Sequence, residues 1–221
     1  MMTHVCALSF SERPAAVEPS GLLILHHGRG ANERDLLELA DVLDPGRALH
    51  IVAPRAPLTI PGWPGYHWYV APRVGYPDPE TFTAAYSQLG EFHDAVWTRT
   101  AIAPERTVLG GFSMGTVMSY ALGLGADRPA PAGILALSGF IPTVAAWRPD
   151  IATRAGLPVF IGHGRSDRVI DIGFAHTARA QLEAGGARVD YHEADGGHQI
   201  EPTIALAARE WLAATLMEAD A

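Results

Sequence analysis

Short apolar runs, separated by longer amphipathic segments, constrain the fold of this 221-residue chain more than any other feature of its sequence. Strands that are buried on both faces of a parallel sheet form continuous apolar runs, and helices usually connect them. The runs lie at residues 22–25, 50–53, 107–109, 133–137, 158–161 and 188–192. This alternation predicts an α/β fold with a mostly parallel central sheet and helices on both faces.

Two of the segments beside these runs have the periodicity of amphipathic helices, in which apolar residues recur every three or four positions. One stripe consists of Phe82, Tyr86, Leu89, His93 and Val96, and the other of Ile204, Ala208, Trp211 and Thr215. Residues 3–10 are predicted to add a strand at the edge of the sheet. Pro14, Pro19 and Gly21 would then turn the chain toward the first core strand.

The chain is expected to form one domain over residues 1–221, because its length suits a single core and no linker or repeat divides it. The segment at about residues 54–79 is rich in Pro and Gly and contains Trp63 and Trp68, which predicts a long irregular loop. Such a loop either forms a lid or wall of a binding site, or packs as a satellite hydrophobic cluster over the sheet edge. The sequence favours neither interpretation.

Composition and charge narrow the class of protein. The formal net charge of −8 comes from scattered acidic residues, which argues against a nucleic-acid partner. No segment has the ~20 apolar residues of a membrane-spanning helix, and the first residues lack the pattern of a secretory signal. Cys6 is the single cysteine, so an internal disulfide is excluded and a reducing, cytoplasmic compartment is expected.

The sequence GFSMG at residues 111–115 predicts a nucleophilic serine. It joins an apolar run to a helical segment, and this strand–turn–helix context lifts a serine hydroxyl clear of a parallel sheet. Gly111 and Gly115 fit, because larger side chains would collide with the facing backbone in so sharp a turn. The five residues alone also fit a serine that only caps a helix, so Ser113 needs partners before it indicates catalysis.

Asp167 and His198 are the predicted partners of Ser113. Each lies in the loop after an apolar run, where parallel sheets build their sites, and the order Ser, acid, His is the one that such a serine site requires. A carboxylate on one ring nitrogen of a histidine fixes the tautomer that accepts the serine proton. Taken singly, Asp167 could equally cap a turn, and His198 could be a histidine with no chemical role.

Other acids and histidines fit structural roles better. Asp171 precedes a helical segment as an N-cap would, and Asp195 lies too close to His198 in sequence for the usual arrangement. His163 and His192 lie within or at the edge of predicted strands, which favours packing or a supporting role.

Acyl transfer also requires N–H donors for the negative oxygen of the tetrahedral intermediate. The backbone N–H of Met114, directly after the serine, is one predicted donor. The backbone N–H of Arg29 is the other, because Gly28 and Gly30 let this loop approach the serine closely.

No metal or cofactor is expected. His26 and His27 are adjacent on a predicted strand and therefore point to opposite faces, and no HExxH pattern accompanies them. The nearby glycines match neither GxGxxG nor GxxxxGK[ST], so a nucleotide site is not indicated.

Six ordered stretches resemble the carboxylesterase/phospholipase family of α/β-hydrolases, which includes acyl-protein thioesterases. They are LHHGRGANERDL, IVAPRAPLTIPGWPGYHWY, TVLGGFSMGTVMSYALGL, GILALSGFIP, PVFIGHGRSDRVID and DGGHQI. The resemblance covers nearly the whole chain from about residue 20. It implies the α/β-hydrolase fold, the triad Ser113, Asp167 and His198, and an oxyanion hole formed by the Arg29 and Met114 amides.

Two positions depart from the family pattern. The family often has a small or apolar residue where Arg29 stands and Gln where Met114 stands, although backbone donation survives both differences. A homodimer would be unsurprising for a member of this family.

The expected function is hydrolysis of small carboxylic esters, lysophospholipids or acyl thioesters through an acyl-enzyme. Trp63 and Trp68 are candidate substrate-binding residues whose bulk would favour short acyl chains. The Arg29 side chain either pairs with a substrate carboxylate or, as is commoner, stays solvated. The alternatives are acyl transfer to another acceptor, peroxide-dependent chemistry on the same triad, or a binding module that kept the fold without catalysis.

Overall fold

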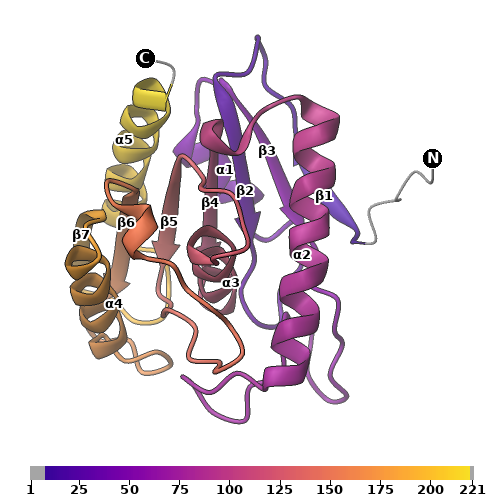
Figure 1. Cartoon of the computed structure of the whole chain (residues 1–221), viewed down its shortest axis with the longest axis vertical. Coiled ribbons are helices and arrows are strands. Elements are labelled where there is room, and N and C mark those ends of the chain that lie inside the picture. The colour runs from indigo at the N-terminus through magenta and orange to yellow at the C-terminus, as the bar shows by residue number, and fades with distance from the viewer. Residues whose placement is uncertain (1–7, 220–221) are drawn as a thin grey trace.

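A seven-stranded sheet forms the centre of the computed structural model, which describes residues 8–219 (Figure 1). The strands are β1 (Phe10–Arg13), β2 (Gly21–His26), β3 (Leu49–Pro54), β4 (Thr107–Phe112), β5 (Gly133–Leu137), β6 (Pro158–Gly164) and β7 (Arg188–Ala194). They lie in the order β1-β3-β2-β4-β5-β6-β7, with β1 antiparallel to β3 and all other neighbours parallel. Each of the six apolar runs falls within a strand, which confirms the predicted mostly parallel sheet.

The edge strand differs from the prediction. Residues 3–7 of the predicted strand at residues 3–10 lie outside the described residues, and the observed strand begins only at Phe10. It continues to Arg13 because its backbone pairs with β3, from Phe10 opposite Pro54 to Arg13 opposite Ile51. Its side chains are alternately exposed and half-buried, so this strand has no apolar run by which a sequence pattern could mark it.

The central strands are apolar throughout because successive side chains enter two different cores. In β2, Leu22 and Ile24 pack into the core on one face of the sheet, and Leu23 and Leu25 pack into the core on the other. Alternation of side chains across a strand has this consequence whenever both faces are covered.

Helices cover both faces (Figure 1). The α-helices are α1 (Leu37–Leu43), α2 (Pro79–Thr100), α3 (Met114–Leu124), α4 (Gly173–Ala184) and α5 (Pro202–Ala219), with short 3-10 turns at Pro104–Arg106 and Ala152–Arg154. Apolar residues of α2, α3 and α4 pack into one core, and those of α1 and α5 pack into the other. No helix within residues 8–219 is long and apolar enough to cross a membrane.

The two predicted stripes face these cores. In α2, all stripe residues are buried except Tyr86, which is half-buried, and in α5 only Trp211 is half-buried. Helix α2 begins at Pro79 because the Asp78 carboxylate accepts the Thr81 N–H at 2.9 Å, as an N-cap does.

The segment between β3 and α2 contains no helix or ladder strand, as predicted for about residues 54–79. Isolated antiparallel bridges tie Ala31 to Tyr66 and Leu58 to His67. Trp68 and Tyr69 are buried in the core that contains α2, whereas Trp63 is 54% exposed. The segment, called here the 55–78 loop, therefore contributes both to a core and to the surface.

Thr116, in the first turn of α3, fastens this helix to the strands behind it. Its hydroxyl lies 2.6 Å from the carbonyl oxygens of Gly111 and of Leu137, and it accepts the Leu137 N–H at 3.1 Å. The side chain is fully buried, so water cannot replace these bonds.

Replacing Thr116 with valine keeps the shape of the side chain but removes the hydroxyl from the Gly111 carbonyl oxygen and the Leu137 N–H, while the Leu137 carbonyl oxygen keeps its bond from the Ser113 N–H. We expect Thr116→Val to lower the free energy of unfolding by about 1–3 kcal/mol, measured by urea denaturation. The control is Thr98→Val, at an exposed position of α2 where the hydroxyl donates to the Asp94 carbonyl oxygen at 2.8 Å. The free energy of unfolding of Thr98→Val should stay within about 0.5 kcal/mol of the wild-type value. Equal losses in the two variants would contradict the role of Thr116.

Candidate functional site

Ser113 lies at the turn between β4 and α3 in a backbone conformation that few residues adopt. Its φ is 56° and its ψ is −119°. A non-glycine residue in such a conformation costs of order 1–3 kcal/mol and persists only where surrounding contacts hold it. The Ser113 N–H donates to the Leu137 carbonyl oxygen at 2.9 Å, which attaches the turn to β5.

The glycines on either side allow this turn to pack against its neighbours. A Cβ atom on Gly111 would lie 2.5 Å from the Gly115 carbonyl carbon, and one on Gly115 would lie 1.9 Å from the His26 carbonyl oxygen. Both distances are far inside van der Waals contact, so no larger residue fits at either position. The predicted reason for these glycines is confirmed.

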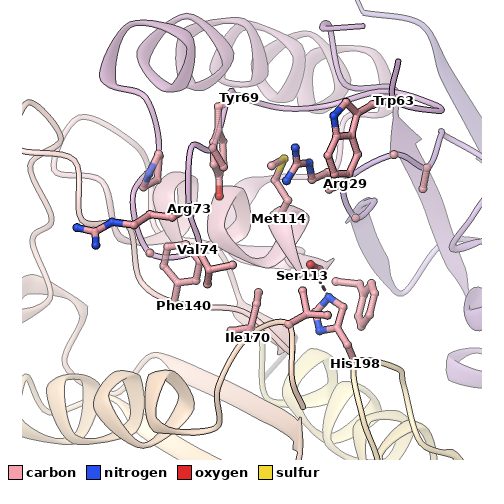
Figure 2. Close-up of a pocket in the computed structure, with 18 of the residues that line it drawn as sticks. Arg29, Trp63, Tyr69, Arg73, Val74, Ser113, Met114, Phe140, Ile170 and His198 are labelled. Carbon is pink, nitrogen blue, oxygen red and sulfur yellow. Dashed lines mark hydrogen bonds between the residues drawn. The ribbon is translucent and has the colours of Figure 1, made fainter. Parts of the chain in front are cut away.

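Ser113, His198 and Asp167 form a continuous chain of hydrogen bonds. The Ser113 Oγ lies 2.8 Å from His198 Nε2, and His198 Nδ1 lies 2.7 Å from Asp167 Oδ2 (Figure 2 shows the first of these bonds). Because an ionised carboxylate only accepts hydrogen bonds, Nδ1 carries the ring proton and Nε2 is free to accept the serine proton. Three residues that are far apart in sequence are thus brought together, with His198 between Ser113 and Asp167.

The loop after β6 holds Asp167 in its ionised form. The Asp167 side chain is fully buried, and its Oδ1 accepts the N–H groups of Val169 and Ile170, each at 2.8 Å. Burial raises the pKa of the Asp167 carboxyl, but the hydrogen bonds from His198, Ile170 and Val169 outweigh this and place the pKa below its usual value.

His163, on β6, supports the same loop. Its Nε2 lies 2.8 Å from the Ile170 carbonyl oxygen and 3.4 Å from Asp167 Oδ2. Because a carbonyl oxygen only accepts, His163 Nε2 donates to it, and within residues 8–219 the buried Nδ1 has no partner. This geometry matches the supporting role that the sequence favoured for His163.

The other acids and histidines lie away from the hydrogen-bond chain. Asp171 accepts the N–H of Gly173, the first residue of α4, at 2.8 Å, although Ile172 rather than Asp171 is the formal N-cap. Asp195 is exposed and pairs with Arg165 at 2.6 Å. His192 pairs with Asp190 on the surface of β7.

The two predicted oxyanion donors lie in segments that adjoin Ser113. Met114 follows it directly, and a Cβ atom on Gly28, next to Arg29, would lie 3.6 Å from the Ser113 Cβ. Within residues 8–219, neither the Arg29 nor the Met114 N–H donates to a protein acceptor. Both groups are therefore available to a ligand bound beside the serine.

His26 and His27 each have protein partners instead of sharing a ligand. His26 Nδ1 lies 2.8 Å from Ser119 Oγ and its Nε2 lies 3.1 Å from His93 Nε2, inside the core. His27 Nε2 accepts the Ala56 N–H at 3.0 Å. The described residues contain no group of three or more His, Cys, Asp or Glu side chains placed to hold a metal.

A cavity of about 750 Å³ opens beside Ser113 and His198 (Figure 2). Its walls are mostly apolar or aromatic and include Trp63, Tyr69, Val74, Phe140, Val169 and Ile170. This volume lies in the range of pockets that bind small organic molecules. Trp63 is thus placed in the wall of the cavity, as the sequence predicted for a substrate-binding residue.

Trp68 does not line this cavity, contrary to the prediction. Its side chain is fully buried, and its indole N–H donates to the His27 carbonyl oxygen at 2.9 Å. The side chain also packs against the rings of His26 and His27. Trp68 therefore holds the strand end that leads into the Arg29 loop, and the bulk that it adds lies in the core.

Several wall residues were missed in the sequence. Phe140 follows β5, and Ile170 follows β6, at the carboxyl edge of the sheet where the rule that found Asp167 also applies. Tyr69 and Val74 come from the 55–78 loop and had no comparable signal, because an irregular segment does not reveal which of its side chains turn inward.

A mostly parallel sheet with a serine, a histidine and an aspartate joined at its carboxyl edge is the arrangement of α/β-hydrolases. The family model described as Phospholipase/Carboxylesterase matches residues 13–216. The chain belongs to this family.

Individual relatives agree with this assignment. The Bacillus subtilis (strain 168) protein named "Putative hydrolase MhqD" is 29% identical over 190 residues, which cover 86% of this chain and 91% of that protein. The crystal structure of a Bacillus cereus carboxylesterase superposes with a TM-score of 0.82 at 24% identity and covers 95% of both chains. The crystal structure of esterase PE8 gives 0.79 at 28% identity, over 94% of this chain and 99% of that one.

These findings establish the class of enzyme. The protein is a hydrolase of the phospholipase/carboxylesterase type, and it has the α/β-hydrolase fold that its sequence predicted.

The lowered pKa of Asp167 makes its contribution to stability depend on pH. That contribution is fully present above the unfolded-state pKa of about 3.9 and is lost as the pH falls through the lower folded-state pKa. We expect the difference in unfolding free energy between wild type and Asp167→Asn to be largest near neutral pH and to shrink below about pH 4, measured by urea denaturation.

The matched control is Asp195→Asn, whose carboxylate is 91% exposed. Its difference from wild type should be small at every pH. If the difference in unfolding free energy between wild type and Asp167→Asn stays constant from neutral to acidic pH, Asp167 is not an ionised carboxylate with a lowered pKa.

Proposed function

We infer that the protein hydrolyses small carboxylic esters through an acyl-enzyme, with Ser113 as nucleophile, His198 as base and Asp167 as the partner of the histidine. The observation that carries this proposal is the hydrogen-bond chain of 2.8 and 2.7 Å that ends at the wall of an apolar cavity. Acyl thioesters and lysophospholipids belong to the same proposal, because a serine alkoxide attacks all three at a carbonyl carbon.

In the first half of the reaction, His198 Nε2 takes the Ser113 proton as Oγ attacks the carbonyl carbon. The N–H groups of Arg29 and Met114 stabilise the negative oxygen of the tetrahedral intermediate. Collapse of this intermediate breaks the ester bond, and the histidine proton passes to the leaving alcohol or thiol. The acyl group stays on Ser113.

In the second half, water takes the place of the alcohol. His198 removes a proton from the water as its oxygen attacks the acyl carbon, and the proton returns to Ser113 Oγ when the carboxylic acid leaves. Asp167 stabilises the positive charge that the imidazole carries in both halves, without accepting its proton.

Removal of the Ser113 hydroxyl tests the nucleophile directly. We expect Ser113→Ala to lower kcat for 4-nitrophenyl acetate by about 10⁴-fold or more and to abolish labelling by a fluorophosphonate probe. Wild type should release a burst of 4-nitrophenol, equal to the enzyme concentration, if deacylation is the slower half. Ser166→Ala, which removes an exposed hydroxyl beside Asp167, is the control and should keep both activity and labelling.

The same measurements separate the alternatives. A folded wild-type protein that is not labelled and does not cleave any ester would favour the binding module. Products formed with an added alcohol or with hydrogen peroxide, in place of the free acid, would favour acyl transfer or peroxide-dependent chemistry at the same serine.

The aromatic wall predicts the length of the acyl group. Tyr69 and Phe140 are both buried and line the cavity, and we expect their rings to restrict an extended acyl chain. We expect kcat/KM for 4-nitrophenyl esters to be highest for short acyl chains and to fall as the chain lengthens from acetate to dodecanoate. A higher kcat/KM for 4-nitrophenyl dodecanoate than for 4-nitrophenyl butyrate would contradict this expectation.

A further inference from the structure

Arg29 extends a cation over the cavity beside the serine. Its guanidinium carbon lies 4.0 Å from the centre of the Trp63 ring, and both residues line the cavity. Figure 2 shows this stacked pair close to Met114 and above Ser113. Stacking on an aromatic face uses the plane of the guanidinium and leaves its in-plane N–H donors free.

The Arg29 guanidinium has no acidic partner within residues 8–219. Other cavity charges do not neutralise it. Arg73 is a second cation in the wall, stacked on Tyr76, and Figure 2 shows it directed away from Ser113. Asp35 is exposed at the wall and forms no ion pair with a described residue. Arg29 therefore supplies the cavity with a cation whose in-plane donors are not used by a described acidic residue.

The Tyr69 hydroxyl is a second unused donor of the same cavity. Within the described residues it has no hydrogen-bond partner, and Figure 2 shows it directed into the cavity on the other side of Met114 from Trp63. Burial raises the pKa of Tyr69, and the positive charge of Arg29 lowers it by less, so the hydroxyl keeps its proton at neutral pH. A protonated phenol donates to an anion.

We propose that Arg29 and Tyr69 form an anion-recognition pair, and that the preferred substrates are esters that carry a carboxylate group. The inference rests on the proposed serine mechanism and specifies which esters it acts on. A carboxylate accepts two in-plane N–H bonds from a guanidinium and one further bond from a hydroxyl, so its acceptor sites match this pair. Tyr69 is buried, whereas Arg29 is exposed at the mouth of the cavity, so the hydroxyl bond forms away from solvent and the guanidinium bond forms at the cavity entrance.

The test compares each carboxylate-bearing ester with the neutral ester in which that carboxylate is methylated. For the acyl side, the pair is mono-4-nitrophenyl glutarate, which ends in a carboxylate, and 4-nitrophenyl methyl glutarate, in which a methyl ester replaces it. For the alcohol side, the pair is 4-acetoxybenzoate and its methyl ester. The quantity measured is the ratio of kcat/KM for the anionic ester to kcat/KM for its neutral counterpart, at low ionic strength. Arg29→Gln and Tyr69→Phe are judged by how they change this ratio, since the intrinsic reactivities of the esters are the same for every variant.

We expect this ratio to exceed one for wild type in at least one of the two pairs, and that pair tells which side of the ester carries the carboxylate. Arg29→Gln should lower the ratio about tenfold, and Tyr69→Phe about threefold, because a charge-assisted hydrogen bond is worth more than a neutral one. If Arg29→Gln also shifts the backbone N–H of residue 29, the loss of rate applies to both esters of a pair and cancels in the ratio.

The matched control is Arg34→Gln. This substitution removes the same charge from an exposed arginine of the same loop that does not line the cavity, so the ratio should stay at the wild-type value. A fall as large as that of Arg29→Gln would mean a general effect of net charge and would overturn the pair.

The remaining outcomes are equally decisive. A wild-type ratio at or below one for both ester pairs, or an unchanged ratio in either Arg29→Gln or Tyr69→Phe, overturns the proposal. Failure of the recognition pair is distinct from failure of the serine mechanism. In the first case Ser113→Ala still abolishes hydrolysis of all four esters, and in the second case hydrolysis survives that substitution.

Discussion

The left-handed backbone at Ser113 is the constraint on which the rest of the site depends. It is held from three directions: the β5 backbone accepts the Ser113 N–H, the Thr116 side chain bonds to β4 and β5, and the β2 backbone lies against Gly115. Since these contacts come from neighbouring strands, a change in their spacing would move the hydroxyl away from His198. The parallel sheet therefore sets the direction of the serine as well as carrying it.

The histidine and the acid depend on a different part of the sheet. His198 follows β7 and Asp167 follows β6, and these strands are paired from Pro158 opposite Arg188 to Gly164 opposite Ala194. That pairing brings the two loops side by side, and internal bonds to Val169 and Ile170 then orient the carboxylate. Two loops with few regular features thus acquire a defined geometry from the strands that precede them.

Much of this could be predicted from sequence because the signals are local or follow from strand order. The central strands are apolar on both faces, Ser113 lies at the centre of a GFSMG segment, and Asp167 and His198 each follow a strand of the parallel sheet. Trp68 was assigned to the wrong environment because an aromatic side chain in an irregular loop has the same sequence signature whether it faces a cavity or a core. Its bond to the His27 carbonyl oxygen depends on how two distant loops approach each other, and no short pattern encodes that.

The contact between the 55–78 loop and the Arg29 loop has a consequence for how members of such a family can diverge. Trp68 bonds to the backbone of His27, Gly30 donates to Tyr66, and a Cβ atom on Gly65 would lie 1.9 Å from the Gly30 carbonyl oxygen. The 55–78 loop, which lines the cavity, and the loop that contains Arg29 are therefore held together by direct contacts to the backbone. A graft of the 55–78 loop alone would break these contacts to the segment that contains Arg29, whereas a graft of both segments would keep them.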